Sequence, residues 1–522
     1  MSRFTAKTQK RRVSASLRLI AVLFLMSLSL ACSKPSNIRP AAPATVVTLT
    51  IGVPNPAGQD PVRGIQAVAG IISSEGLVTV GRDGRAIPRL AESWSSGSDG
   101  MTWSFKLRPT AVFHDGTPVD AKAVKASLER SIASADRDLS PGLADILAIE
   151  TPGPQELVIR LRNQSTFLMD DLGVAIRKYA KNGQVVGTGP YITAPPVEGQ
   201  IDLRAFDRHY RGTPNIGRVV VRPYPTVRTA WAAMMRGEID FLYEVGQDAR
   251  EFIEGEASTT VFPFLRSYVY GVIFNARRST FRDSRIRRAL NYAVDRPAIV
   301  QHAFSGRGKP ISVPAWPEHW AFDQTAEGST HDPARASALL ETAGVRELRR
   351  IPGRPAAKLH FTCLLPENIP LWERLALLVQ RDLAAVGVDM QLESEPIEIF
   401  SERLAAGNFD AVLLEEIVGN SASRPFSFWH STSRQNVWGF RSPAVDRALD
   451  DLRRASNDAE YREAFRQYQQ QTLDDPPEIV LALGEIARAV SKRFVVVAPA
   501  GSDILPTIAD WRLSEDPERV SN

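Results

Sequence analysis

The chain has 522 residues and a formal net charge of +4, from 63 Lys and Arg residues against 59 Asp and Glu residues. The first 31 residues contain six of the basic residues and none of the acidic ones, so the remaining 491 residues carry 57 minus 59, or −2. The positive charge therefore belongs to a terminal segment and does not indicate nucleic-acid binding. A chain of this length can bury a core unaided and predicts two to four domains.

The first segment has the pattern of a secretory signal peptide. Its basic start precedes an apolar run over 19–26, which is shorter than the ~20 apolar residues of a membrane span. The segment ends in Leu28-Ser-Leu-Ala-Cys32, which resembles the lipobox of bacterial lipoproteins. This resemblance implies a signal peptide over 1–31 and a lipid on Cys32, followed by a flexible spacer within 32–44. The alternatives are an uncleaved anchor or an ordinary signal peptide with an unrelated cysteine.

The cysteine count excludes an intrachain disulfide if Cys32 carries lipid, because only Cys363 then remains. An exported fold without disulfides depends on apolar burial alone. No other segment of the sequence is long and apolar enough to span a membrane.

Strand and helix patterns mix from the start of the remaining chain. Apolar periodicity predicts a buried strand over 46–53 and half-buried strands over 101–107 and 157–161. Asp115-Gly116 predicts a turn, and Thr117-Pro-Val-Asp120 resembles a capping box that opens a helix.

The middle and the second half of the chain continue the mixture. A strand, a helix and a second strand over 358–392 form a βαβ pattern, which predicts that part of the sheet is parallel. Gly187 and Gly189 predict a tight turn. The other predicted elements are strands near 201–206, 218–224, 478–483 and 493–497, and helices near 227–236, from Ser284, over 443–456 and over 458–473.

Motifs of catalysis and of metal binding are absent from the sequence. None of the seven histidines has a partner at metal-ligand spacing, and there is no CxxC pair, GxSxG motif or GxxxxGK[ST] loop. His114, next to Asp115, lies in a predicted turn, and we interpret it as structural. We therefore expect a binding protein that is not an enzyme, with no cofactor and no bound metal.

Several stretches, in the right order, resemble bacterial solute-binding protein family 5, the oligopeptide- and dipeptide-binding lipoproteins of ABC transporters. The resemblance covers residues 46 to about 513. The segments that carry it are 75–77, Ala91-Glu-Ser-Trp94, 102–108, 113–120, 187–191, 236–240, Phe274-Asn275, 281–290 and Asp295-Arg296.

This resemblance implies an α/β fold of the two-lobed periplasmic-binding-protein type (type II, cluster C-like), with an additional subdomain. The lobes of such proteins hinge shut around a small ligand. The implied ranges are 45–75, 185–275 and 480–522 for lobe I, 76–184 for the additional subdomain, and 276–479 for lobe II.

The resemblance also implies where a ligand binds, and this chain departs from the pattern there. In the peptide-binding members a tryptophan and, three residues later, an aspartate that pairs with the ligand's amino group follow a strand. Here Glu416 stands at the tryptophan position and Gly419 at the aspartate position. A buried ammonium needs a paired anion. Either Glu416 or Glu415, which alternation places on opposite faces, supplies it, or the ligand is not a peptide with a free amine.

Five aromatic and histidine side chains complete the candidate ligand site. Aromatic rings in a cleft offer apolar contact together with a polar tip. The alternative is that each belongs to the core. These candidates are Tyr268, Tyr270, Trp429, His430 and Trp438.

A run of arginines follows residue 276. Ile286, Leu290 and Ala293 predict an amphipathic helix there, so we interpret the arginines as its solvated face. The alternatives are a patch for nucleic acid or lipid headgroups, or a contact with a membrane partner. The arginines are Arg277, Arg278, Arg282, Arg285, Arg287 and Arg288.

We therefore expect the substrate-binding component of an ABC importer. It would capture a peptide or peptide-like solute and deliver it to the permease and ATPase subunits. We expect a monomer without nucleic acid, tethered by lipid in the periplasm, with the outer membrane favoured in a Gram-negative cell because Ser33 follows the cysteine. The alternatives are a signalling or chaperone-like module without a permease, a receptor for an opine, sugar or metal chelate, and, third, an enzyme.

Overall fold

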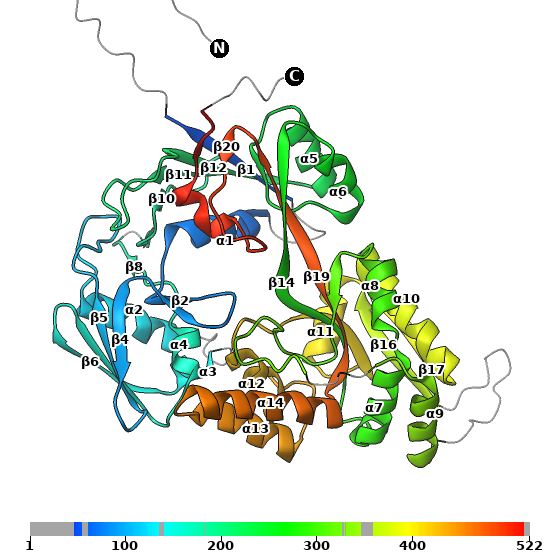
Figure 1. Ribbon diagram of the computed structural model, residues 1–522. Coiled ribbons are helices and arrows are strands. Elements are labelled where there is room, and N and C mark those ends of the chain that lie inside the picture. The colour runs from blue at the N-terminus through cyan, green and yellow to red at the C-terminus, as the bar shows by residue number, and fades with distance from the viewer. Residues whose placement is uncertain are drawn as a thin grey trace, which may run out of the picture. The chain divides into compact units, whose positions relative to one another are not determined.

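The computed structural model describes residues 46–54, 61–134, 140–181, 183–325, 328, 330–345 and 359–515 (Figure 1). The predicted signal peptide, Cys32 and the predicted spacer lie outside the described residues. Helices and strands alternate throughout the described chain, so the predicted α/β class is confirmed.

One sheet of eleven strands runs through most of the described chain. Its first part contains, in order, β10 (Tyr191–Thr193), β11 (Ile201–Ala205), β12 (Arg218–Tyr224), β1 (Thr48–Pro54) and β13 (Phe241–Leu242). Its second part contains β19 (Glu478–Ser491), β14 (Thr259–Phe274), β18 (Ala411–Ile417), β16 (Leu359–Pro366) and β17 (Val388–Glu395), with β15 (Gly308–Pro310) beside β19. β1 is parallel to β12 and β13, and β16 is parallel to β17 and β18, as the βαβ pattern predicted.

Two long antiparallel strands, β14 and β19, join the two parts of this sheet. β13 pairs with the end of β19, whereas β18 pairs with the second half of β14. The sequence predicted that the strand near 478–483 ends there, but β19 continues through Ser491. The apolar pattern breaks at Gly484-Glu485, while the backbone pairing with β14 continues past it, and that pairing cannot be read from side chains.

A separate antiparallel sheet lies within residues 91–161, in the order β4 (Ala91–Ser96), β5 (Thr102–Leu107), β7 (Glu156–Leu161) and β6 (Ile146–Gly153). α2 (Ala121–Ile132) begins beside it. The N-cap of α2 is Asp120, whose Oδ1 accepts a hydrogen bond from the Ala123 N–H at 2.8 Å. The predicted capping box at Thr117 is wrong, because the Thr117 hydroxyl donates to Asp115 in the preceding turn.

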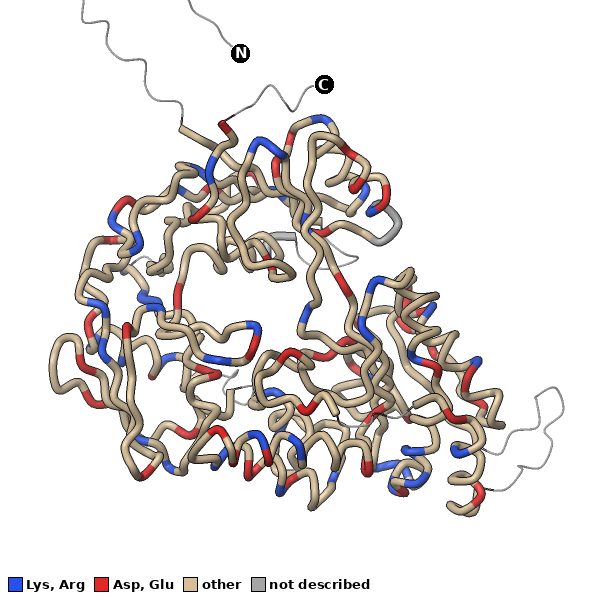
Figure 2. The backbone as a smooth tube through the Cα atoms, viewed as in Figure 1, with Lys and Arg blue, Asp and Glu red and all other residues tan. Residues whose placement is uncertain are grey.

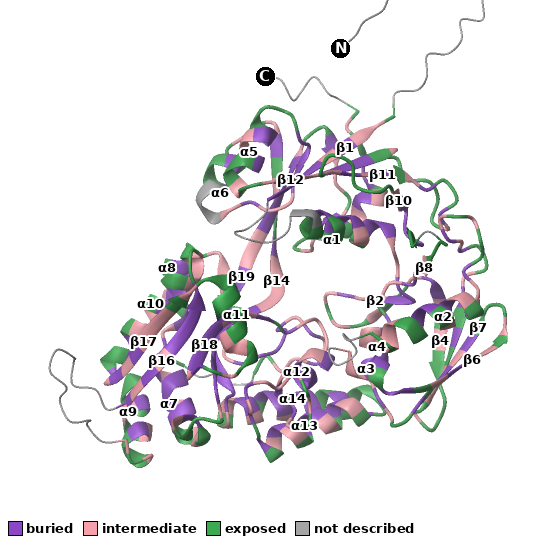
Figure 3. Cartoon of the chain, turned by 180° about the vertical axis from the view of Figure 1, so that it is seen from behind, coloured by how far each residue is buried: buried purple, intermediate pink, exposed green. Residues whose placement is uncertain are grey.

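Helices cover both faces of the second part of the large sheet, and Figure 3 shows the buried strands between them. Alternate strand residues, such as Leu413 and Val412, enter two different hydrophobic clusters. The first cluster includes α7 (Ser284–Ala293), α8 (Arg296–Ala303), α9 (Pro333–Thr342) and α10 (Pro370–Ala385). The second includes α11 (Ile397–Ala405), α12 (Ser423–Trp429), α13 (Pro443–Arg454) and α14 (Asp458–Asp474).

The remaining hydrophobic residues form clusters of their own. One lies within 77–176, and another combines α1 (Pro61–Ser73) with β1, β12 and the 3-10 helix η3 (Leu505–Asp510). α5 (Val227–Met235) and α6 (Gln247–Glu254) share a smaller cluster with β19. Each predicted part therefore has a buried cluster, whereas the residue boundaries stay predictions.

Two glycines allow segments of the fold to pack at very short range. A Cβ at Gly187 would lie 2.1 Å from the backbone oxygen of Ser73, and one at Gly189 would lie 2.6 Å from the Ser73 carbonyl carbon. Neither glycine has a positive φ, so close approach rather than a special turn requires them. The His114 ring lies against the same segment, with Nε2 2.9 Å from the Gly189 oxygen, so its role is structural.

Gly187→Ala should lower the free energy of unfolding by about 1–3 kcal/mol, because the new methyl group would meet backbone rather than a movable side chain. Urea denaturation measures the change. Gly153→Ala is the matched control and should stay within about 0.5 kcal/mol, since its Cβ would lie 3.6 Å from the end of the Glu156 side chain. Equal stability of the two variants would contradict the close-approach explanation.

Candidate functional site

Ligands of open α/β sheets bind beyond the carboxyl ends of the parallel strands. In the first part of the sheet, β13 ends just before Glu244, and in the second part β18 ends at Ile417. β14 runs from one part to the other and pairs with β18, with Tyr270 opposite Glu415 and Tyr268 opposite Ile417. These strand ends therefore define the candidate ligand site.

Five side chains, which we call the junction cluster, meet there: Glu244, Arg266, Tyr268, Tyr270 and Glu415. The Arg266 guanidinium lies 3.8 Å from the Glu415 carboxylate and 3.9 Å from the centre of the Tyr268 ring. Glu415 also hydrogen-bonds to Tyr270, and Glu244 is close enough to raise the pKa of both. Charged residues of both signs lie along β14 and β19 (Figure 2). The cluster thus presents an arginine, carboxylates and phenols together.

A bulge in β14 shapes this cluster. Leu265 pairs with Glu485 and Val269 with Leu483, so four steps along β14 match two along β19. The residues between them leave the β14–β19 ladder, and the Ser267 carbonyl instead accepts hydrogen bonds from the backbone N–H groups of Val418 and Gly419, at 3.1 and 3.2 Å. Bulges of this kind re-aim side chains beside functional sites.

Burial sets the protonation of the cluster. Burial raises the pKa of Glu415, against the opposing effect of the nearby Arg266. Burial, followed by the charge of Glu415, raises the pKa of Tyr270, so its hydroxyl stays protonated. A carboxyl group that holds its proton more tightly than usual is one that a cationic ligand would ionise.

Glu416 points to the other face of β18. Its side chain is 4% exposed and faces Glu478, and no other group among the described residues hydrogen-bonds to either carboxyl. Burial raises the pKa of both, that of Glu478 to about 7. The carboxyl group of Glu416 is therefore enclosed in the core, and the carboxyl group beside Tyr270 belongs to Glu415.

Gly419 begins the loop after β18 with a φ of +66°, in the left-handed region that favours glycine. Carboxyl groups reach this loop from α4 (Phe167–Asp171): Asp170 accepts hydrogen bonds from Ser421 and from the Ser423 backbone N–H. Asp171 accepts from the Gly142 N–H at 2.7 Å, and burial raises its pKa to about 7. The loop that lacks the family's aspartate is thus contacted by two half-buried acids.

The other three candidates lie in the core around α12. Trp429 is 1% and Trp438 4% exposed, with ring centroids 6.4 Å apart. The His430 ring stacks on Phe426 at 4.4 Å, and its Nδ1 lies 2.8 Å from the Thr432 hydroxyl. The structure brings none of the three into the junction cluster. Sequence reasoning missed Glu244 and Arg266, since only the pairing of β14 shows that they meet Glu415.

Residues 82–85, between β2 (Val78–Val80) and β3 (Ala86–Pro88), contact the predicted lobe II. Arg82 pairs with Glu318, and the Arg85 guanidinium lies 2.9 Å from Asp458 and 3.6 Å from the centre of the Trp320 ring. A hollow of about 860 Å³ beside these contacts is lined partly by tryptophans. Residues 82–85 are therefore joined to the range predicted as lobe II by contacts that do not involve β14 or β19.

Within the described residues, no three His, Cys, Asp or Glu side chains are grouped so as to hold a metal ion. The helices in the same ranges are each too short or too polar to cross a membrane.

A family model agrees with this architecture. The model of bacterial extracellular solute-binding proteins, family 5, matches residues 85–439, which is more than half of the chain. The chain belongs to this family. Family 5 proteins act outside the cytoplasm, where they bind solutes that are then transported, and they are not enzymes. The predictions of the family and of a non-catalytic protein are therefore confirmed.

Individual relatives give the same result. The probable D,D-dipeptide-binding periplasmic protein DdpA of Escherichia coli (strain K12) is 26% identical over 436 residues, which cover 77% of this chain and 80% of the relative. NikZ from Campylobacter jejuni, in complex with Ni(L-His), has a TM-score of 0.76 at 21% identity and covers 89% of this chain and 99% of its own. AgaA from A. tumefaciens R10, in complex with agropinic acid, has a TM-score of 0.73 at 25% identity, with 90% and 99% covered. The two-lobed fold of family 5 is thereby confirmed.

Four acids, of which Glu416 and Glu478 are enclosed and Asp170 and Asp171 are half-buried, make the stability of this family 5 protein depend on pH. Burial raises the pKa of Asp170, Asp171, Glu416 and Glu478, so the folded chain keeps protons that the unfolded chain releases near pH 4. Stability should therefore fall as pH rises towards and beyond 7. Burial lowers the pKa of the half-buried His114 and of the buried His319, and these two groups oppose the fall in stability only below about pH 6.5.

The urea midpoint should therefore be lower at pH 8.5 than at pH 6.5. Glu416→Gln should make this dependence shallower, because it removes one of the enclosed acids. Glu402→Gln, on the exposed side of α11, is the control and should leave the dependence unchanged. A midpoint that rises over this interval would contradict the assignment.

Proposed function

We propose that this family 5 protein is the substrate-binding component of an ABC importer and that it captures a peptide-like solute at the junction cluster. The observation that carries this proposal is the meeting of Arg266 with Glu415 and two tyrosines at the carboxyl ends of the parallel strands. The two parts of the large sheet would close on the solute there and deliver it to a permease.

The charges of the cluster favour a solute that carries charges of both signs. Arg266 offers a planar fork that suits a carboxylate, and Glu415 with Glu244 offers anions for an ammonium group. Tyr268 and Tyr270 add apolar area with a polar tip. We place Glu415, rather than the enclosed Glu416, in the role of the aspartate that Gly419 replaces.

The names of the relatives support a small polar solute without fixing its identity. DdpA is described by a dipeptide, NikZ by a nickel–histidine complex and AgaA by agropinic acid. A dipeptide and histidine both present a carboxylate beside nitrogen, and agropinic acid is named as an acid. A peptide-like zwitterion is therefore the class that fits both the relatives and the junction cluster.

Lipidation of Cys32 completes the proposed function, because it would keep the receptor beside the membrane that holds its permease. Cys32→Ser should move the protein from the membrane fraction to the soluble extract of the cell envelope. Immunoblotting of the two fractions measures this, with Cys363→Ser as the control for loss of a thiol. Retention of the Cys32→Ser protein on membranes would contradict the anchor.

A binding experiment tests the junction cluster. Free tripeptides should bind the purified protein, and Glu415→Gln should weaken them at least about tenfold, or 1.4 kcal/mol, because the ammonium loses its anion. N-acetylation of the tripeptide should cost a similar factor in the unchanged protein and little in the variant. Isothermal titration calorimetry measures both.

Glu402→Gln is the matched control, since it removes an exposed carboxylate of lobe II outside the cluster. Unchanged affinity in Glu415→Gln would remove Glu415 from the site. The absence of any thermal shift with peptides, opines, sugars and metal chelates would contradict the transport function itself.

A further inference from the structure

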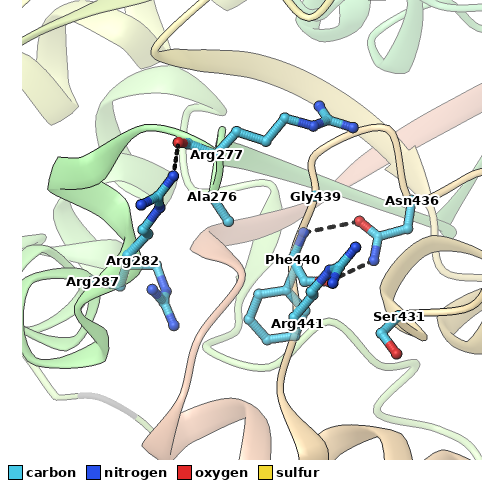
Figure 4. Close-up of a pocket in the computed structure, with 9 residues that line it drawn as sticks. All are labelled: Ala276, Arg277, Arg282, Arg287, Ser431, Asn436, Gly439, Phe440 and Arg441. Carbon is cyan, nitrogen blue, oxygen red and sulfur yellow. Dashed lines mark hydrogen bonds between the residues drawn. The ribbon is translucent and has the colours of Figure 1, made fainter.

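A second hollow, of about 470 Å³, lies in lobe II beyond the end of β14 (Figure 4). Four arginines line it, and none of its lining residues is acidic: Arg277, Arg282, Arg287 and Arg441. We call it the arginine pocket. It begins just after Phe274, six residues along β14 from Tyr268, which corresponds to about 20 Å of strand. β14 pairs with β18 from Tyr268 to Phe274. The junction cluster lies at the Tyr268 end of this paired stretch, and the arginine pocket lies at the Phe274 end.

Two side-chain amides, of the buried Asn275 and the half-buried Asn436, fix the walls of this pocket. Asn275, 2% exposed, donates to the Phe409 oxygen at 2.9 Å and accepts from the Arg277 N–H at 3.2 Å. On the other wall, Asn436 donates to the Phe440 oxygen at 2.7 Å and accepts from the Phe440 N–H at 3.1 Å, as Figure 4 shows. The backbone that carries the arginines is therefore held in place without a ligand.

The positive charge of the pocket is poorly neutralised. Arg287 is buried and pairs with Asp475, and Asp283 acts on it as well. Arg277 and Arg282 donate to backbone oxygens but form no ion pair with a described residue.

Arg441 is exposed and has no hydrogen bond or ion pair with any residue of the described ranges. Figure 4 shows Arg282 and Arg287 on one side of the pocket and Arg441 beside Phe440 on the other. Guanidinium groups gathered around one hollow repel one another, and an anion between them would relieve that cost.

The shape and chemistry of the pocket favour one class of anion. Arginine forks bind phosphate oxygens in pairs. The volume lies within the ~300–1,000 Å³ of small-molecule sites, which leaves room for a group attached to the phosphate. Ala276, which is half-buried, offers that group apolar contact.

We propose that the arginine pocket binds a phosphomonoester, with its phosphate held by Arg282 and Arg441. The ester is either a soluble molecule or the headgroup of phosphatidic acid, and both present a phosphate attached through a single ester bond. The site is separate from the solute site, so the inference does not depend on the proposed transport function.

Calorimetry with the purified protein tests the proposal, using phenyl phosphate and inorganic phosphate as probes and phenol as the uncharged control. Phenyl phosphate should bind saturably and more tightly than inorganic phosphate, and phenol should not bind. Arg441→Ala and Arg282→Ala should each weaken phenyl phosphate at least about tenfold, and Arg441→Lys should weaken it less. Arg441 makes no contact that the fold needs, so its variants should stay folded.

Arg447→Ala is the matched control, because Arg447 is exposed on α13 outside the pocket. It and Glu415→Gln should leave phenyl phosphate affinity unchanged. The proposal would be overturned if phenyl phosphate showed no saturable binding, or if Arg441→Ala and Arg447→Ala weakened it equally. Loss of binding in Glu415→Gln would also overturn it, because the anion would then bind at the junction cluster.

Flotation with vesicles distinguishes the two sources of the phosphate. The Cys32→Ser protein, which has no lipid of its own, is mixed with phosphatidylcholine vesicles with or without phosphatidic acid. Flotation that requires both phosphatidic acid and Arg441 supports a phospholipid headgroup. Phenyl phosphate binding without flotation supports a soluble ester.

Discussion

The antiparallel pairing of β14 with β19 is the interaction on which the rest of the structure depends. These two strands belong to both parts of the large sheet, since β13 pairs with one end of β19 and β18 with the opposite half of β14. Backbone hydrogen bonds hold the two strands together whatever their side chains are. The side chains near the bulge can therefore serve ligand binding instead of strand pairing. The bulge between Leu265 and Val269 uses that freedom, because it turns Arg266 and Tyr268 out of the ladder beside Glu415.

Alternation along β18 separates two glutamates that are neighbours in the sequence. Glu415 faces Arg266 and Tyr270, whereas Glu416 is enclosed against Glu478. One carboxyl group keeps partial contact with solvent, and the other keeps its proton in the core. A strand side chain has only these two faces to choose from, so the register of β18 with β14 decides which glutamate meets a ligand.

The arginines after β14 illustrate how tertiary packing changes the meaning of a charge pattern. On α7, Arg285 is exposed and Arg288 is half-buried, but the predicted solvated face is wrong for Arg287, which is 4% exposed and paired with Asp475. Arg441 comes from a loop far along the chain and lines the same hollow as Arg282. Contact with water is enough to account for the position of a single exposed arginine. Several arginines around one hollow that has no acidic lining residue instead indicate a site for an anion.

Local patterns in the sequence were sufficient to predict the family, the α/β class and most of the elements, because patterns such as the alternation over 102–107 and the βαβ unit over 358–392 act over short distances. They also located the strand that carries Glu415 and Glu416. The folded chain was needed to show that Glu415 meets Arg266, that Trp429 and Trp438 belong to the core, and that α4 brings two acids to the loop after Gly419. Those outcomes depend on strand register and on contacts between segments more than a hundred residues apart, which leave no periodic signal in a single sequence.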